Sequence, residues 1–260
     1  MDLIGFAFYS AIVVFFYFTV IFALALLKKD NSIVDIAWGV GFVLVAFLSF
    51  FLGGRYFMRQ ILITTLVFVW GMRLAIHIAL RNRGRGEDFR YAQWRKDWGK
   101  WFVLRSFFQI YMLQGLLLLI IVYPIILING LSDRGLSFLD AAGVVVWLIG
   151  FVFESVGDYQ LLQFKRKAEN RGKIMTQGLW RLTRHPNYFG EIVMWWGLFL
   201  IALSVKNGVS AIISPMMVTF LLLRVSGITM LEKKYSHNRE FLAYARRTNA
   251  FFPWFPKNEN

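Results

Sequence analysis

The chain has 260 residues, of which 58% are hydrophobic and only 17% are charged, and it contains no cysteine. A soluble domain of this size carries more charge and interrupts its apolar runs more often, so the composition predicts a membrane protein. The lack of cysteine excludes disulfides, thiolate catalysis and cysteine-ligated metal sites.

Apolar runs long enough to cross a bilayer recur along the whole chain. About 20 apolar residues span the hydrocarbon core as a helix, and these runs lack the period-2 alternation of an outer-membrane barrel. In chain order they cover approximately 3–27, 33–52, 58–80, 106–129, 137–163, 188–205 and 209–231. We therefore predict an all-α, polytopic integral membrane protein: one domain over 1–260, built as a bundle of seven transmembrane helices.

The net charge of +14 is distributed unevenly over the predicted connections. Most Lys and Arg residues fall in 81–105, 164–187 and 232–260, which lie on one side of the predicted bundle. The opposite side carries Arg55, Arg59, Arg134 and Lys206. By the positive-inside rule the N-terminus is expected outside and the C-terminus in the cytosol. Topology and anionic headgroups account for the charge, so the expected partner is the bilayer, with no nucleic acid and no obligate protein partner.

The predicted spans contain ionisable residues, many of them in the inner halves of the helices. In chain order these are Asp35, Arg73, His77, Glu154, Asp158, Glu191 and Arg224. One interpretation is structural, with pairs such as Arg73–Asp35 or Arg224–Glu191 stabilising the bundle. The other is that acids and bases from several helices meet in one functional site on the cytosolic side.

Common cofactor motifs do not occur in this sequence. The three histidines at 77, 185 and 237 form no H-x-x-x-H pair, so no metal site is predicted. There is also no G-x-G-x-x-G after a strand and no Walker-type loop. A bound nucleotide would need side chains of the inner connections: cations for phosphates, Asn for amide edges and aromatic rings for stacking.

Three inner segments carry such residues in a fixed order. They read 81-RNRGRG-86, then 157-GDYQLLQFKRK-167 leading to 180-WRLTRHPNYFGE-191, then 224-RVSGITMLEKKYSHNREFLAYARRTNAFFPWFP-256. This set resembles the steroid 5α-reductase family in its bacterial form. More distantly, it is similar to the sterol C14-reductases and the isoprenylcysteine carboxyl methyltransferases. The resemblance covers roughly residues 65–256 and is strongest from Gly157 onward.

The resemblance implies NADPH bound on the cytosolic side and a steroid or other lipid substrate that enters from the membrane. The cofactor-binding residues that it implies are Asn82, Arg85, Asp158, Lys165, Arg184, His185, Asn187, Tyr188, Glu191, Arg224, Glu232, Tyr235 and Tyr244. For catalysis, Asp35 stands where the family has a Glu that polarises the substrate carbonyl. Trp70 falls near the position of the family's Tyr, and Arg73 is a possible helper.

The leading hypothesis is an NADPH-dependent reductase that transfers a hydride to an activated C=C of a steroid or other lipid in a bacterial inner membrane. One alternative is a membrane methyltransferase that uses S-adenosylmethionine, because those enzymes share R-H-P-x-Y and the terminal tyrosines. The many cations favour a phosphate-rich nucleotide over a sulfonium cofactor. A non-enzymatic lipid-binding or scaffold protein, with structural buried charges, is the third possibility.

Overall fold

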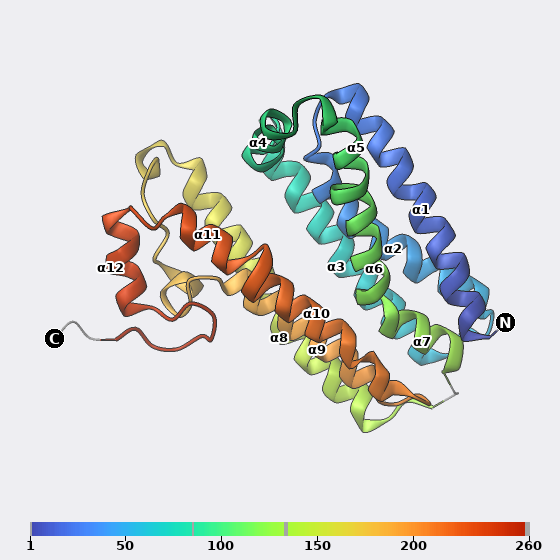
Figure 1. The fold of residues 1–260 in the computed structure, drawn as a ribbon. Helices are drawn as coiled ribbons and strands as arrows, with labels where there is room; N and C mark the ends of the chain where they lie inside the picture. Colours follow the sequence, from blue (N-terminus) through green and yellow to red (C-terminus); the bar gives the residue numbers. More distant parts are fainter. Residues whose placement is uncertain (1, 85, 133–134, 258–260) are drawn as a thin grey trace. The chain divides into compact units, whose positions relative to one another are not determined.

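The computed structural model describes residues 2–84, 86–132 and 135–257, and every regular element in those ranges is a helix (Figure 1). Within those ranges, six helical segments are long and apolar enough to cross a membrane. They are Leu3–Lys28, Ile33–Gly53, Met58–Asn82, Phe89–Ile121, Phe138–Arg166 and Gly208–Lys233. The all-helical membrane class is therefore confirmed.

The run expected at 188–205 forms α9 (Pro186–Ala202), a helix of 17 residues. At 1.5 Å per residue it is about 25 Å long, somewhat short of a hydrocarbon core of about 30 Å. Seven crossings, and the orientation of the termini, stay predictions.

The chain divides into two compact units, which we call unit 1 and unit 2. Unit 1 comprises Met1–Ser137 and Ala202–Ala211, and unit 2 comprises Phe138–Ile201 and Ile212–Asn260. That residues 1–260 act as one domain stays a prediction.

Unit 1 is organised around α2. Its long helices are α1 (Leu3–Lys28), α2 (Ile33–Gly53) and α3 (Met58–Asn82), followed by α6 (Leu113–Ile121) and α7 (Tyr123–Leu131). Helix α2 packs against α1, α3 and α7. It approaches α3 closely at Gly39 and Gly71, where a β-carbon on Gly39 would lie 2.5 Å from the Gly71 carbonyl oxygen. The backbones touch there because neither residue has a side chain.

Buried polar side chains also join the helices of unit 1. The Asn129 amide on α7 donates to the Ser49 hydroxyl on α2 at 2.8 Å, and the Gln60 amide on α3 donates to the Asn129 carbonyl at 2.6 Å. All three residues are fully buried. In a membrane, where lipid is as apolar as the helix faces, such bonds contribute to helix association.

The connection 81–105, expected as a long inner loop, is largely helical. It contains α4 (Phe89–Trp98) and α5 (Phe102–Ser106), and helical backbone then continues to Ile121. Asp88 caps α4 by accepting a hydrogen bond from the Arg90 amide at 3.0 Å, and Gly99 ends it at φ 48°. These local start and stop residues explain why a charged segment forms a helix here.

Unit 2 contains three long helical segments and a short helix near its end. Its helices are α8 (Phe138–Arg166), α9, α10 (Ile213–Phe220), α11 (Ile228–Lys234) and α12 (Arg239–Arg247). The long segments are formed by α8, by α9 and by α10 with α11, and the short helix is α12. Helices α10 and α11 belong to the predicted run 209–231, but a π-helical stretch over Leu221–Val225 and a break at Ser226 and Gly227 interrupt it.

Helices α8 and α9 contact each other through glycines spaced seven residues apart. A β-carbon on Gly150 would lie 2.5 Å from the Gly190 carbonyl oxygen, and one on Gly143 would lie 2.6 Å from that of Gly197. Gly157 continues the row at 3.1 Å from the Pro186 ring. We call these five glycines the glycine seam. Close backbone contact through small residues is typical of helix pairs in membranes.

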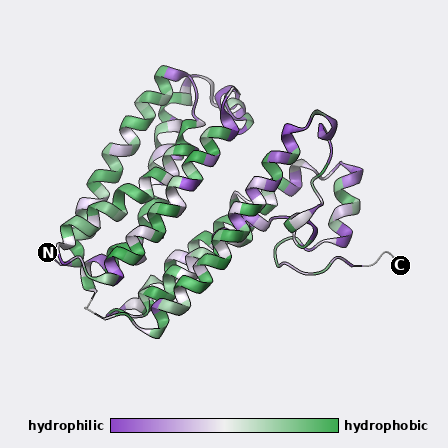
Figure 2. Ribbon diagram, turned by 180° about the vertical axis from the view of Figure 1, so that it is seen from behind, coloured by the Kyte–Doolittle hydropathy of each residue, from purple (hydrophilic) through white to green (hydrophobic). Residues whose placement is uncertain are grey.

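Hydropathy separates the helix shafts from their ends. Figure 2 shows hydrophobic residues along the long helices of each unit, and hydrophilic residues gathered around α4 in unit 1 and around α12 in unit 2. Large apolar side chains are exposed on the shafts, among them Phe16 on α1 and Val152 on α8. Lipid is the solvent that such surfaces fit.

Candidate functional site

In unit 1, Asp35 in the first turn of α2 binds two side chains from α4. The Tyr91 hydroxyl donates to Asp35 Oδ1 at 2.6 Å, and Arg90 Nη2 pairs with Asp35 Oδ2 at 2.8 Å. The Asp35 side chain is 16% exposed and Tyr91 is buried. We call Asp35, Arg90 and Tyr91 the Asp35 cluster. It contains a phenol whose hydroxyl a carboxylate orients, and a guanidinium that balances the charge of that carboxylate.

Residues on both sides of the Asp35 cluster hold it in place. The Asp88 amide donates to the Ser32 hydroxyl at 2.7 Å, and the Asn31 amide donates to Glu87 Oε1 at 2.9 Å. Arg95 on α4 binds both oxygens of Glu87, at 2.7 and 3.0 Å. The start of α2 and the segment before α4 are therefore joined by hydrogen bonds from the backbone of each to a side chain of the other.

Asp88 contributes a further bond to Arg90, whose Nε lies 2.9 Å from Asp88 Oδ1. Burial would raise the pKa of Asp88, but the hydrogen bonds from the side chain and amide of Arg90 outweigh it and leave that pKa below its ordinary value. Asp88 is thus held as an anion, and Arg90 is fixed between two carboxylates.

Arg90 and Tyr91 were not among the site residues predicted from the sequence. The available signal was the helix start at Asp88, which places Arg90 and Tyr91 in the first turn of α4, where they can reach α2. The expected partners of Asp35 lie on α3: Trp70 is buried with its ring centroid 5.2 Å from that of Phe42, and Arg73 is half-buried. The catalytic roles of Asp35, Trp70 and Arg73 stay predictions.

A pocket of about 330 Å³ lies between the end of α3 and the start of α4. It is lined by Arg81, Asn82, Gly86, Glu87, Asp88 and Phe89. Asn82, an expected cofactor residue, accepts a hydrogen bond from Arg81 Nε at 3.3 Å. Arg85, expected beside it, lies outside the described residues.

In unit 2, Arg184 precedes α9 and is bound on several sides. Its Nε and Nη2 donate to the two oxygens of Glu232 on α11 at 2.8 and 2.9 Å. Its Nη1 donates to the carbonyls of Ala245 and Thr248, at 3.0 and 2.6 Å. The side chain is only 11% exposed. The guanidinium thus joins the start of α9 to α11 and to the end of α12.

His185 shares the same carboxylate. Its Nε2 lies 3.1 Å from Glu232 Oε1, and its ring stacks on Tyr188 with centroids 5.4 Å apart and planes 7° apart. Thr183 bonds the His185 amide and donates to the Phe251 carbonyl at 2.9 Å. The motif 180–191 is therefore folded against the segment that follows α12.

Asn187 and Asp158 face each other across the glycine seam. Asn187 Nδ2 donates to Asp158 Oδ1 at 3.1 Å. The other amide atom, Asn187 Oδ1, is buried and has no hydrogen-bond partner among the residues described. A buried acceptor without a donor costs free energy, so this oxygen is suited to an external donor.

Tyr235 and Tyr244, two of the remaining expected cofactor residues of unit 2, both lie beside the Phe241 ring. Tyr244 donates its hydroxyl to the Trp180 carbonyl, and burial raises the pKa of that phenol. The Tyr235 ring is 5.6 Å from that of Phe241. Lys165 and Arg224 are exposed and Glu191 is half-buried. The structure thus brings together Arg184, His185, Tyr188 and Glu232, and separately Asp158 and Asn187. In the described part of the chain no three His, Asp or Glu side chains are placed to hold a metal.

Apolar helix shafts with ion-paired clusters at helix ends define an integral membrane protein that carries polar sites. Residues 21–248 match the family model described as "Protein of unknown function (DUF1295)". The chain belongs to this family, which is steroid 5α-reductase-like, and the resemblance seen in the sequence is confirmed.

Individual relatives give shorter matches. An "uncharacterized protein" of Schizosaccharomyces pombe is 27% identical over 70% of this chain and 60% of its own length. The mouse "3-oxo-5-alpha-steroid 4-dehydrogenase 1" is 34% identical over 27% of this chain and 28% of its own. "Probable O-methyltransferase ustE" of Ustilaginoidea virens is 36% identical over 27% of this chain and 25% of its own. The chain thus spans at most about 60% of these relatives, and no solved structure matches it significantly.

Proposed function

We propose that this protein is an NADPH-dependent membrane reductase that transfers a hydride to the C=C of an α,β-unsaturated carbonyl in a steroid or other lipid. The observation that carries the proposal is the Tyr91–Asp35 hydrogen bond, 2.6 Å long and beside Arg90. A phenol held by a carboxylate is the kind of donor that stabilises negative charge on a substrate carbonyl oxygen. The partial matches to steroid reductases from mouse and cotton support the same reaction class.

The residues of unit 2 fit a nicotinamide nucleotide. Asn187 Oδ1, buried and without a partner among the described residues, can accept a hydrogen bond from a carboxamide or a ribose hydroxyl. Lys165 and Arg224 are exposed and can bind phosphate oxygens. Arg184 and His185 are bound to Glu232 instead, so we assign them the role of holding this part of the site in shape.

When bound, NADPH supplies the hydride. The Tyr91 hydroxyl donates its hydrogen bond to Asp35 Oδ1 in the structure, and rotation about its C–O bond would turn the same O–H toward a substrate carbonyl oxygen. Asp35 meanwhile keeps its charge balanced by Arg90. Tyr91 would thereby stabilise the charge that develops on the carbonyl oxygen, and Asp35 and Arg90 hold the phenol in place before the substrate binds. The α-carbon would take its proton from water.

A second candidate is a methyltransferase that uses S-adenosylmethionine. The fungal O-methyltransferase matches over the same share of this chain as the mouse steroid enzyme, and this observation favours it. Methyl transfer needs no donor to a carbonyl oxygen, so it gives the Asp35 cluster no chemical role.

The test is made on the full chain purified in detergent. We expect NADPH to raise the melting temperature more than NADH or S-adenosylmethionine does, and Asn187→Ala to remove most of that rise. With a 3-oxo-4-ene steroid as probe, Tyr91→Phe should lower NADPH oxidation at least about a hundredfold while the NADPH-induced shift remains. Tyr159→Phe, which removes an exposed hydroxyl on α8, is the control and should leave both unchanged. Stabilisation by S-adenosylmethionine alone would instead establish the methyltransferase.

A further inference from the structure

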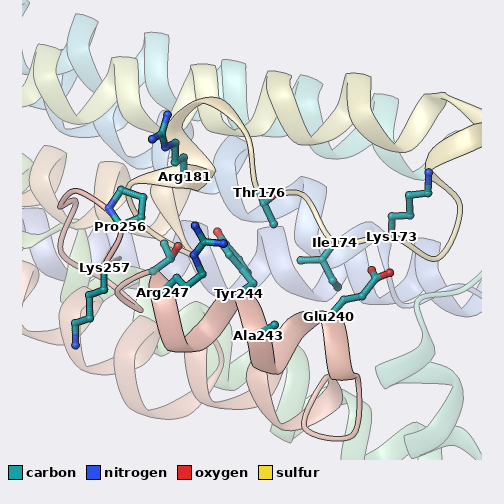
Figure 3. A pocket seen from close by; sticks show the side chains of 11 residues that line it. Lys173, Ile174, Thr176, Arg181, Glu240, Ala243, Tyr244, Arg247, Pro256 and Lys257 are labelled. Carbon is teal, nitrogen blue, oxygen red and sulfur yellow. The ribbon is translucent and has the colours of Figure 1, made fainter. Parts of the chain in front are cut away.

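Unit 2 contains a pocket of its own. Of the residues expected to bind NADPH, only Tyr244 lines it. Its volume is about 600 Å³, and it is open to the surface beside α12. Figure 3 shows Arg181 and Lys257 near Arg247 and Tyr244, and Lys173 at the other end of the pocket, near Ile174 and Glu240. We call it the basic pocket.

The charge of the basic pocket is strongly positive. Four cations line it, Lys173, Arg181, Arg247 and Lys257, against one carboxylate, Glu240. In the described part of the chain Lys173, Arg181 and Lys257 form no ion pair. Cations from separate segments around one hollow raise the local concentration of anions, and Arg and Lys are the preferred donors to phosphate oxygens.

Hydrogen bonds between the segments hold the walls of the basic pocket. The Lys257 amide donates to the Arg247 carbonyl at 2.9 Å, and the Trp254 amide donates to the Leu182 carbonyl at 2.9 Å. The hydroxyl of Tyr244, on α12, donates a hydrogen bond to the Trp180 carbonyl. The cations are therefore carried by backbone that is fixed before any anion arrives, which lowers the entropy cost of binding.

The source of the anion follows from the surface next to the pocket. Phe252, Trp254 and Phe255 are 61%, 64% and 79% exposed, and they immediately precede Pro256 and Lys257 in the pocket wall. Large aromatic rings left open beside cations are typical of the headgroup region of a bilayer, where a ring enters the interface and a cation meets a phosphate.

We propose that the basic pocket binds the phosphate of an anionic phospholipid headgroup and that the exposed aromatic rings enter the adjacent interface. This binding anchors the end of unit 2 to the membrane surface. It is independent of the proposed reductase reaction, since it uses none of the residues assigned to hydride transfer.

The test compares two double variants of the full chain in neutral detergent. Arg181→Gln/Lys257→Gln removes two pocket cations, and Arg166→Gln/Lys233→Gln removes one Arg and one Lys of unit 2 outside the pocket. Binding of phosphatidylglycerol, phosphatidylcholine, inorganic phosphate and adenosine 2′,5′-bisphosphate is measured by native mass spectrometry and by the shift in melting temperature.

We expect wild type and the control variant to bind phosphatidylglycerol in preference to phosphatidylcholine. The pocket variant should bind it about 30-fold more weakly, from about 1 kcal/mol for each cation. Its melting temperature without ligand should match that of the control, which separates lost binding from lost folding. Equal phosphatidylglycerol binding by both variants would overturn the proposal. So would a pocket-dependent preference for inorganic phosphate or the bisphosphate, because the ligand would then be a soluble phosphate.

Discussion

Arg184 joins three segments of unit 2 through one guanidinium. It binds both oxygens of Glu232 and the carbonyls of Ala245 and Thr248, and its own amide donates to the Asn249 carbonyl at 2.9 Å. A planar side chain with five donors in a fixed fork suits this arrangement, and an ammonium on a flexible stem does not. At the scale of single residues, the contacts made at position 184, just before α9, therefore require an arginine.

Replacing Arg184 should affect stability before it affects chemistry. We expect Arg184→Ala to lower the free energy of unfolding by about 2–3 kcal/mol, because Glu232 and two carbonyls lose their donor in a largely buried place. Denaturant titration in detergent measures this loss. Arg184→Lys should recover less than half of it, and Arg166→Ala, an exposed change on α8, should cost almost nothing. An unchanged stability in Arg184→Ala would contradict the role given to these bonds.

At the scale of elements, the glycine seam determines how α8 and α9 pack. The spacing of seven residues keeps Gly143, Gly150 and Gly157 on one side of α8. Gly190 and Gly197 on α9 pack against Gly150 and Gly143. Asp158 follows Gly157, and Asn187 lies three residues before Gly190, so the seam sets the register of the Asn187–Asp158 hydrogen bond.

A methyl group inside the seam should separate the two helices. In Gly150→Ala the new carbon would lie 2.5 Å from the Gly190 carbonyl oxygen and 2.6 Å from the Met194 nitrogen, both of them backbone atoms that cannot rotate away. We expect the free energy of unfolding to fall by about 3 kcal/mol, which also lowers the melting temperature. Gly135→Ala is the matched control, because its β-carbon would meet nothing within 4 Å. Equal melting temperatures for the two variants would show that the helices do not pack this closely.

Hydropathy alone was enough to predict the long helices, since a run of apolar residues cannot avoid helical structure in lipid. The interruptions were not predicted. The break at Gly227 and the π-helical stretch before it leave the apolar pattern unchanged, so no periodicity signals them. Helix α4 was missed for the opposite reason: it is charged and resembles a loop in hydropathy, although Asp88 and Gly99 mark its ends.

The same physics limits prediction of the site. A motif such as 181–191 shows which groups are present, but the partner of each group depends on segments that return from far along the chain. The bond of Arg184 to Glu232 was not predicted because Glu232 lies 48 residues away in sequence. Tyr91 was missed because it reaches Asp35 from a different helix, 56 residues on.

At the scale of the whole molecule, the predicted path of the chain through the membrane can be tested by labelling. The chain contains no native cysteine, so single cysteines can be introduced without removing others. We expect Lys206→Cys to react with an impermeant maleimide on intact cells and Arg171→Cys to react only after lysis, because the distribution of cations predicts that the two positions lie on opposite sides of the membrane. Labelling of both from the same side would mean that α9 does not cross.

The contacts of Thr183 and Arg184 also govern the order in which unit 2 can mature during synthesis. Both residues leave the ribosome long before the carbonyls of Thr248, Asn249 and Phe251 that they bind. Helices α8 and α9 can pair through their glycines early, whereas the turn between them must wait for a segment made more than 60 residues later. A ribosome that stalls after α11 would therefore leave a paired helical hairpin whose connecting turn still lacks the carbonyls that it binds.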